Sequence, residues 1–155
     1  MYRWHELEHA QPELAATGVR LLAQNEVAFL ATVSASGRPR LHPFVPKICR
    51  GRLVAFIIDS SPKARDLALR KQYSIHAALG AEDEEFFVSG SAGPSETDTA
   101  LRNEVALAMG FATRVDDSHR LFEFRIDRAL WTRWLDFGTP NHRAQYVRWN
   151  LGLSN

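Results

Sequence analysis

The sequence predicts a mainly β fold, a small closed or split barrel with helices at its periphery. Three observations support this prediction: apolar runs of strand length recur, short turn signals separate them, and one run leads directly into a helix-like segment. In the stretch 29–69 the turn signals are Ser-Gly-Arg-Pro and Arg-Gly, and Asp-Ser-Ser-Pro precedes the helix-like segment. We expect about six strands in a single domain covering residues 1–155.

The first predicted helix covers Pro12–Gln24. Proline in a first turn, an acidic residue beside it and apolar residues at helical spacing are typical of a helix that begins there. The residues before it, Trp4 to Glu8, are expected to form a short arm. Both segments are expected to lie outside the chemistry of the protein, with the helix packed on the barrel.

Three strands follow. Ala28–Ser34 and Leu53–Ile58 are continuous apolar or β-branched runs, which suits strands buried on both faces. Leu41–Cys49 contains Pro43 and Pro46, and each proline removes a backbone donor. This strand should therefore be bulged or lie at an edge. The unpaired backbone of this strand can then face a planar ring system. Alternatively, the strand is an ordinary edge strand that proline protects from aggregation.

The remaining elements alternate short helices with strands. A helix over Ser61–Lys71 has serine at its cap and proline in its first turn, and a second helix over Thr99–Met109 stops at Gly110. Four further strands are predicted at Ser74–Leu79, Glu85–Ala92, Leu121–Ile126 and Ala129–Leu135. The tail, at about 136–155, is predicted to be a loop that docks an aromatic cluster.

Charge and cysteine content restrict the function classes. A net charge of +1 and a pI near 8.0 argue against a dedicated nucleic-acid binder, which usually has a strongly basic domain. The single cysteine, Cys49, excludes an internal disulfide framework and is expected to be a buried, inert thiol. No leader-like or membrane-spanning apolar run occurs, so we expect a cytoplasmic protein without membrane contact.

Catalytic and metal-binding motifs are missing from the sequence. Among the histidines, His5 and His9 alone share a short ligand spacing, and they lie in the N-terminal arm, so no metal site is expected. There is no Gly-x-Ser-x-Gly elbow, Walker loop or Gly-x-Gly-x-x-Gly fingerprint. We therefore name no catalytic side chain.

The junction between the third strand and the following helix predicts an anion site. The first N–H groups of a helix have no internal partner, and the helix dipole is positive at that end. Lys63 and Arg65 lie at this junction, with the hydroxyl groups of Ser60 and Ser61 beside them. Nine of the nineteen basic residues fall between Arg38 and Lys71. A ligand that carries a phosphate is therefore the first functional hypothesis.

Two motifs carry a family resemblance. The run Gly-Arg-Pro-Arg-Leu-His-Pro-Phe at 37–44, followed by Ser-Pro-Lys-Ala-Arg-Asp-Leu at 61–67, resembles the paired signature of the pyridoxamine 5′-phosphate oxidase-like, FMN-binding split β-barrel superfamily. The resemblance covers roughly residues 27–92 and continues more weakly to Trp134. It specifies the fold rather than the reaction.

The resemblance implies a homodimer with a cofactor site shared between subunits. The cofactor would be FMN or a deazaflavin coenzyme. Its phosphate would be held at the strand-to-helix junction and its ring against the proline-containing strand. The implied cofactor-binding residues are Arg40, His42, Pro43, Phe44, Ile57, Ile58, Ser61 and Lys63. We also expect Trp131 or Trp134 to form part of a substrate wall, against the alternative that both are core residues.

The resulting functional hypothesis is a flavin-dependent oxidoreductase that transfers hydride between its cofactor and a small organic substrate. The C-terminal segment Tyr146–Leu151 does not reproduce the Arg/Trp-rich signature of pyridoxamine phosphate oxidases proper, so vitamin B6 oxidation is not the first choice. The alternative is a non-catalytic flavin- or haem-binding module, with His42 or His76 as contacts. A barrel that binds nucleic acid through the basic segment is a third hypothesis.

Overall fold

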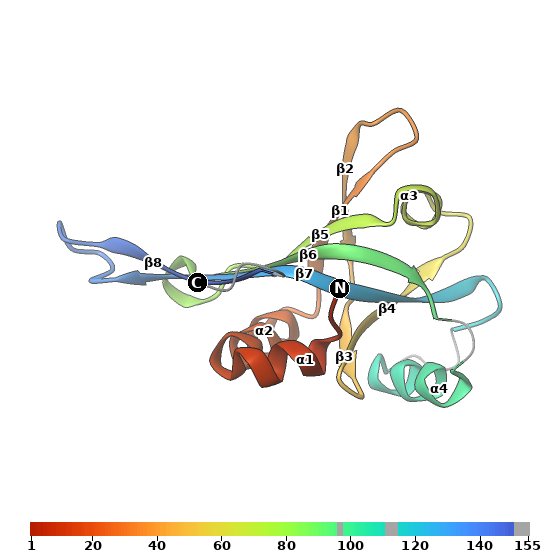
Figure 1. The fold of residues 1–155 in the computed structure, drawn as a ribbon, viewed down its shortest axis with the longest axis horizontal. Coiled ribbons are helices and arrows are strands. Elements are labelled where there is room, and N and C mark those ends of the chain that lie inside the picture. Colours follow the sequence, from red (N-terminus) through yellow and green to blue (C-terminus); the bar gives the residue numbers. More distant parts are fainter. Residues whose placement is uncertain (96–97, 111–114, 151–155) are drawn as a thin grey trace.

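The computed structural model describes residues 1–95, 98–110 and 115–150. Its centre is an antiparallel sheet in the order β2-β1-β5-β6-β7-β4-β3, with β8 added on β7. Figure 1 shows the helices around this sheet. The strands are β1 (Ala28–Val33), β2 (Pro39–Phe44), β3 (Lys47–Cys49), β4 (Arg52–Ile58), β5 (Gln72–His76), β6 (Glu85–Pro94), β7 (His119–Leu135) and β8 (Arg143–Asn150). The mainly β class predicted from the sequence is confirmed.

The segment predicted as one strand, Leu41–Cys49, forms two. β2 pairs with β1 and ends at Phe44, and β3 pairs with β4. Val45 and Pro46 separate them, and Pro46 cannot donate a ladder hydrogen bond. Because β2 and β3 stand at opposite ends of the strand order, the sheet must curl until its ends approach each other. β2 is an edge strand, so it tolerates Pro43, as expected.

The helices are α1 (Trp4–Ala10), α2 (Pro12–Gln24), α3 (Pro62–Arg70) and α4 (Thr99–Ala108), with a short 3₁₀ turn at Ala81–Asp83. The prediction of α2 is confirmed at both ends. The prediction of an N-terminal arm is wrong, because Trp4 and Leu7, one helical turn apart, are both fully buried. The Trp4 ring lies 6.0 Å from the ring of Phe86, so tertiary packing stabilises this short helix.

The end of the chain also differs from the prediction. β7 is one continuous strand, although Leu121–Ile126 and Ala129–Leu135 were predicted as separate strands. At this point β7 has a bulge: Ser89 of β6 pairs with Arg128 and Gly90 pairs with Ile126, so Asp127 has no partner on β6.

The predicted C-terminal loop contains the strand β8, which pairs with β7 from Arg128 to Leu135. Val147 and Trp149 of β8 pack against the core. Residues 151–155 of the predicted tail lie outside the described residues.

Two apolar cores lie on opposite faces of β4. Leu53 and Ile57 face the larger core, which fills the barrel, and Val54 faces a smaller one beneath α4. Cys49 belongs to the smaller core, and its burial raises the pKa of its thiol, as expected of an inert cysteine. Among the described helices, none is long and apolar enough to cross a membrane.

Candidate functional site

Polar side chains from β1, β2 and α3 meet at one edge of the barrel. We call this group the β2–α3 cluster; it consists of Thr32, Arg40, His42, Lys63 and Asp66. Thr32 pairs with Arg40 across the β1–β2 ladder, and His42 lies two residues further along the same face of β2. α3 packs against β1, which brings its first turns to this edge.

The first turn of α3 follows from local sequence. Ser61 caps the helix, and its hydroxyl accepts a hydrogen bond from the backbone N–H of Ala64 at 3.3 Å. Pro62 occupies the first helical position, where a missing N–H costs nothing. The next residue, Lys63, reaches back to β2 and donates from Nζ to the carbonyl oxygen of Pro43 at 3.2 Å. Its ammonium group thus stands at the positive end of the helix dipole.

Asp66 lies at the centre of the cluster and is 5% exposed. It accepts a hydrogen bond from the hydroxyl of Thr32 at 2.8 Å, and its other oxygen lies 3.6 Å from the guanidinium of Arg40. The Thr32 hydroxyl also lies 3.2 Å from Nε2 of His42. These contacts join the two strands and the helix through one buried carboxylate.

The electrostatics of the cluster favour an anion. Burial lowers the pKa of Lys63, because the charged form is disfavoured away from water. Burial and the neighbouring Lys63 lower the pKa of His42, against an opposing effect of Asp66. The cluster contains two cations, Arg40 and Lys63, and one carboxylate, Asp66, so it carries excess positive charge. A phosphate at this edge would relieve the repulsion between the cations.

The structure separates the apolar residues predicted to line a cofactor. Phe44 and Ile57 are 5% and 1% exposed and belong to the larger core, where the Phe44 ring lies 5.7 Å from that of Phe124. Ile58 is 48% exposed and faces the opposite side of β4, because neighbouring strand residues alternate. The side chains of Ile57 and Ile58 therefore lie on opposite sides of β4 in one chain.

The two tryptophans lie far from the β2–α3 cluster in the same chain. Across the ladders from β1 through β5 and β6, Thr32 of the cluster is level with Ile126 of β7, three strands away. Trp131 lies five residues beyond Ile126, roughly 16 Å further along the strand. Its indole N–H donates to Glu84 at 2.8 Å. The ring of Trp134 lies 5.7 Å from that of His142. Figure 1 shows β8, which pairs with this part of β7, and α3 on opposite sides of the molecule.

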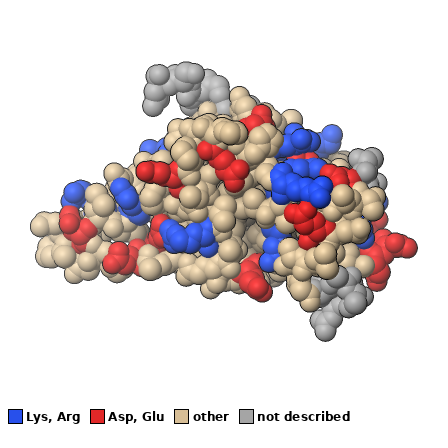
Figure 2. All heavy atoms as spheres, turned by 90° about the horizontal axis from the view of Figure 1, so that it is seen from below, with Lys and Arg blue, Asp and Glu red and all other residues tan. Residues whose placement is uncertain are grey.

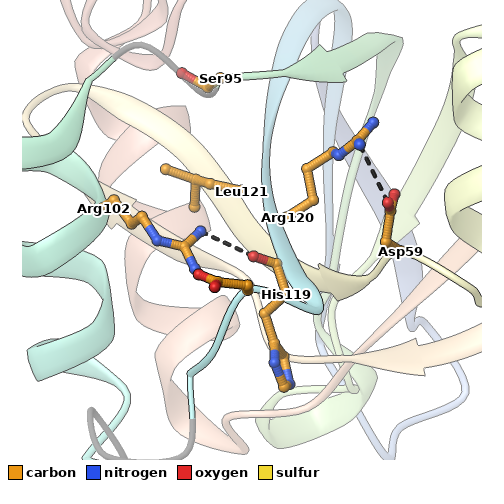
Figure 3. A pocket seen from close by; sticks show the side chains of 7 residues that line it. Asp59, Ser95, Arg102, His119, Arg120 and Leu121 are labelled. Atoms are coloured by element: carbon orange, nitrogen blue, oxygen red, sulfur yellow. Dashed lines mark hydrogen bonds and ion pairs between the residues drawn. The ribbon is translucent and has the colours of Figure 1, made fainter.

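A polar hollow of about 270 Å³ lies away from the β2–α3 cluster, between α4 and the paired ends of β4 and β7 (Figure 3). The guanidinium of Arg102 donates to the carbonyl oxygens of His119 at 2.8 Å and Asp116 at 3.0 Å. Arg120 and Asp59 form an ion pair at 3.1 Å. Both arginines thus hold the strand ends together, and sequence reasoning assigned this hollow no role.

Two members of the cluster, Thr32 and Asp66, were missed by sequence reasoning. Asp66 is one of only two acids between Arg38 and Lys71, which was the available signal. Among the described residues, no group of three or more His, Cys, Asp or Glu could hold a metal ion. On the face shown in Figure 2, basic and acidic residues are interspersed, and no continuous basic stripe is visible there.

Comparisons with known proteins bear on the fold. No protein-family model and no curated protein matches the sequence. Among solved structures, a haem-binding protein from Mycobacterium smegmatis aligns with 22% identity and a TM-score of 0.59, over 82% of this chain and 55% of that one. This chain therefore spans about half of that protein.

Two further solved structures are similar over most of their own length. The haem storage protein HutZ from Vibrio cholerae aligns with 20% identity and a TM-score of 0.59, over 76% of this chain and 89% of that one. A putative pyridoxamine 5′-phosphate oxidase from Listeria innocua aligns with 12% identity and a TM-score of 0.60, over 74% and 94%. The chain therefore has the split-barrel fold of the pyridoxamine 5′-phosphate oxidase-like proteins, as its two sequence motifs predicted.

Proposed function

We propose that the protein is an oxidoreductase that binds FMN, or a deazaflavin coenzyme, at the β2–α3 cluster. The observation that carries this proposal is the position of Lys63. Lys63 belongs to the first turn of α3, and its ammonium group bonds to the backbone of β2. Lys63 and Arg40 are both close enough to His42 to lower its pKa. A helix N-terminus with two convergent cations suits a phosphate group.

The residues of the cluster divide the binding task between them. Lys63 and Arg40 offer charge-assisted hydrogen bonds to the phosphate, and Ser61 caps the first turn of α3 and fixes where that turn begins. The edge of β2 at Pro43, which has no N–H to pair with another strand, can lie against a planar ring. The bound cofactor would supply hydride transfer, and the protein would supply orientation and exclusion of water.

A second copy of the chain completes the proposed site. Within one chain, Trp131 and Trp134 lie on β7, three strands away from Thr32 of the cluster and five or more residues beyond its level in the sheet. The outer face of the β2–β1 ladder, which carries Phe29 at 42% and Leu41 at 68% exposure, is available to a partner. Exposed apolar faces of this kind mark interaction surfaces. We therefore propose a homodimer in which the tryptophans of one subunit approach the cluster of the other.

The dimer can be tested directly. Light scattering at micromolar concentration should give the mass of two chains. Leu41→Glu should give a monomer, because it places a charge on the outer face. Leu107→Glu, at an equally exposed position on α4, should remain dimeric and serves as the control. A wild-type monomer that still holds cofactor would contradict the shared site.

A haem-binding module is the second candidate, and the position of His76 on β5 favours it. Nδ1 of His76 lies 2.6 Å from the carbonyl oxygen of Ala77, so Nδ1 carries the proton and Nε2 keeps a lone pair. A histidine fixed in this way suits a metal ligand. In His42, by contrast, Nε2 is occupied by Thr32. Two of the similar solved structures are described as haem-binding or haem storage proteins.

The cofactor separates the two candidates. The absorption spectrum of the purified full-length chain, with mass analysis of the released group, should show a flavin or deazaflavin. Haem would instead support the module, and His76→Ala should then abolish binding. For a flavin-loaded protein, stopped-flow oxidation against quinones and conjugated carbonyls tests the reaction. Reoxidation no faster than that of free cofactor, for every acceptor and for oxygen, would contradict the oxidoreductase proposal.

A further inference from the structure

We infer that Thr32 and Asp66 are positioning residues that fix the proton of the His42 imidazole on Nε2, so that Nδ1 presents a lone pair to the ligand. Thr32 and Asp66 are 2% and 5% exposed, whereas His42 is only partly buried. The buried pair can therefore orient His42 without itself touching a ligand. The assignment of a ligand rests on the proposed function, but the proton position does not.

The chain of hydrogen bonds has one consistent direction. An ionised carboxylate only accepts, and Asp66 lies 3.6 Å from the guanidinium of Arg40. The Thr32 hydroxyl must therefore donate its single hydrogen to Asp66, at 2.8 Å. Its oxygen is left as an acceptor toward His42, 3.2 Å away, so Nε2 must carry the hydrogen. No described residue forms a hydrogen bond with Nδ1.

The groups around His42 keep Nδ1 unprotonated. Lys63 from α3 and Arg40 from β2 disfavour a positive charge on the imidazole of His42, and Asp66 favours one. Burial is the largest effect and acts with the cations, so the pKa of His42 is lowered from its ordinary value of 6.5. At neutral pH the imidazole is therefore neutral, and Nδ1 has a lone pair that a ligand donor can reach.

This orientation restricts the ligand atom that can lie beside His42. A phosphate or carbonyl oxygen would be repelled by the lone pair on Nδ1, whereas an N–H or O–H group would donate a hydrogen bond to it. Flavins and deazaflavins both carry an imide N–H on their ring. The cluster thus assigns the phosphate to Lys63 and Arg40 and a donor edge of the ring to His42.

The proton position can be measured without any cofactor. Long-range ¹H–¹⁵N correlation spectra of the ¹⁵N-labelled full chain should show His42 protonated on Nε2, with that proton slow to exchange with water. Thr32→Val should make the Nε2 proton exchange rapidly, and Thr32→Ser should restore its protection. In Asp66→Asn the amide can donate to Thr32, which frees the threonine hydrogen for Nε2, so the population protonated on Nδ1 should rise.

The outcomes separate this inference from the proposed function. Wild-type His42 protonated on Nδ1, or an unchanged proton position and exchange rate in both Thr32→Val and Asp66→Asn, would overturn the inference. If Thr32→Val does not fold, Thr32→Ser and Asp66→Asn still test the proton position, because both variants retain a polar side chain of similar size. Titration with FMN is a separate measurement: absence of binding, with the expected spectra, would contradict only the flavin proposal.

Discussion

Glu123→Ala should lower the free energy of unfolding by about 3–5 kcal/mol, the range for removing one partner of a buried ion pair. Glu123 is 7% exposed and lies among three guanidinium groups. Its carboxylate oxygens approach Arg3 at 3.1 Å, Arg52 at 2.6 Å and Arg125 at 3.2 Å. Of these, Arg52 is the most buried, so loss of the carboxylate would leave a desolvated cation with less compensation.

The same carboxylate joins distant parts of the chain. Arg52 on β4 also bonds to Asp98, and Asp98 caps α4 through the N–H of Leu101. Arg3 precedes α1, so the N-terminal helix, the barrel and α4 meet at Glu123. We therefore expect the variant to lose cooperativity of unfolding as well as stability.

Chemical denaturation monitored by tryptophan fluorescence would measure the change. Glu104→Ala is the matched control, because Glu104 forms an exposed ion pair with Arg50 at 2.6 Å. Surface pairs contribute about 0–1 kcal/mol, so this variant should unfold nearly as the wild type does. Equal midpoints for the two alanine variants would show that the network around Glu123 contributes no more than a surface pair.

The elements predicted correctly were those encoded by local patterns. The cap, proline and apolar spacing of α3 lie within a few residues of one another, as do the signals for α2 and β1. α1 and β8 instead depend on contacts with residues distant in the sequence. The helix at Trp4 is short and depends on Phe86, and β8 depends on pairing with β7. Neither contact can be inferred from neighbours in sequence.

In the candidate site, too, local features could be predicted from the sequence and long-range contacts could not. Ser61 and Lys63 could be predicted because a strand-to-helix junction is a local feature. The contribution of Thr32 and Asp66 depends on α3 packing against β1, which only the tertiary structure reveals. The expectation that Ile57 and Ile58 lie near a cofactor came from the family resemblance, which does not say to which side of the strand each side chain points. Alternation along β4 places them on opposite sides.

Lys63→Ala should weaken FMN binding by about 1.5–3 kcal/mol, the range for a charge-assisted hydrogen bond, which corresponds to roughly 10- to 150-fold in Kd. The ammonium group is already held toward β2 by the carbonyl of Pro43, at 3.2 Å. A phosphate that arrives there gains a positioned cation without ordering a free side chain. Because the lysine forms no ion pair shorter than 4 Å in the described structure, the cofactor-free variant should unfold near the wild-type temperature.

Two further variants make the Lys63 experiment specific. Lys63→Met keeps an unbranched apolar stem and removes the charge, so it should lose as much affinity as Lys63→Ala. Arg65→Ala removes a positive charge from the same helix, but Arg65 is exposed and its side chain forms no hydrogen bond or ion pair with another described residue, so its loss should change the Kd little. Calorimetric titration with FMN, alongside thermal unfolding of the cofactor-free proteins, would measure both quantities. If Lys63→Ala unfolds at a lower temperature than the wild type but binds FMN with wild-type affinity, Lys63 is a structural residue. Equal losses of FMN affinity for Lys63→Ala and Arg65→Ala would indicate general electrostatic attraction, in place of a phosphate site at the first turn of α3.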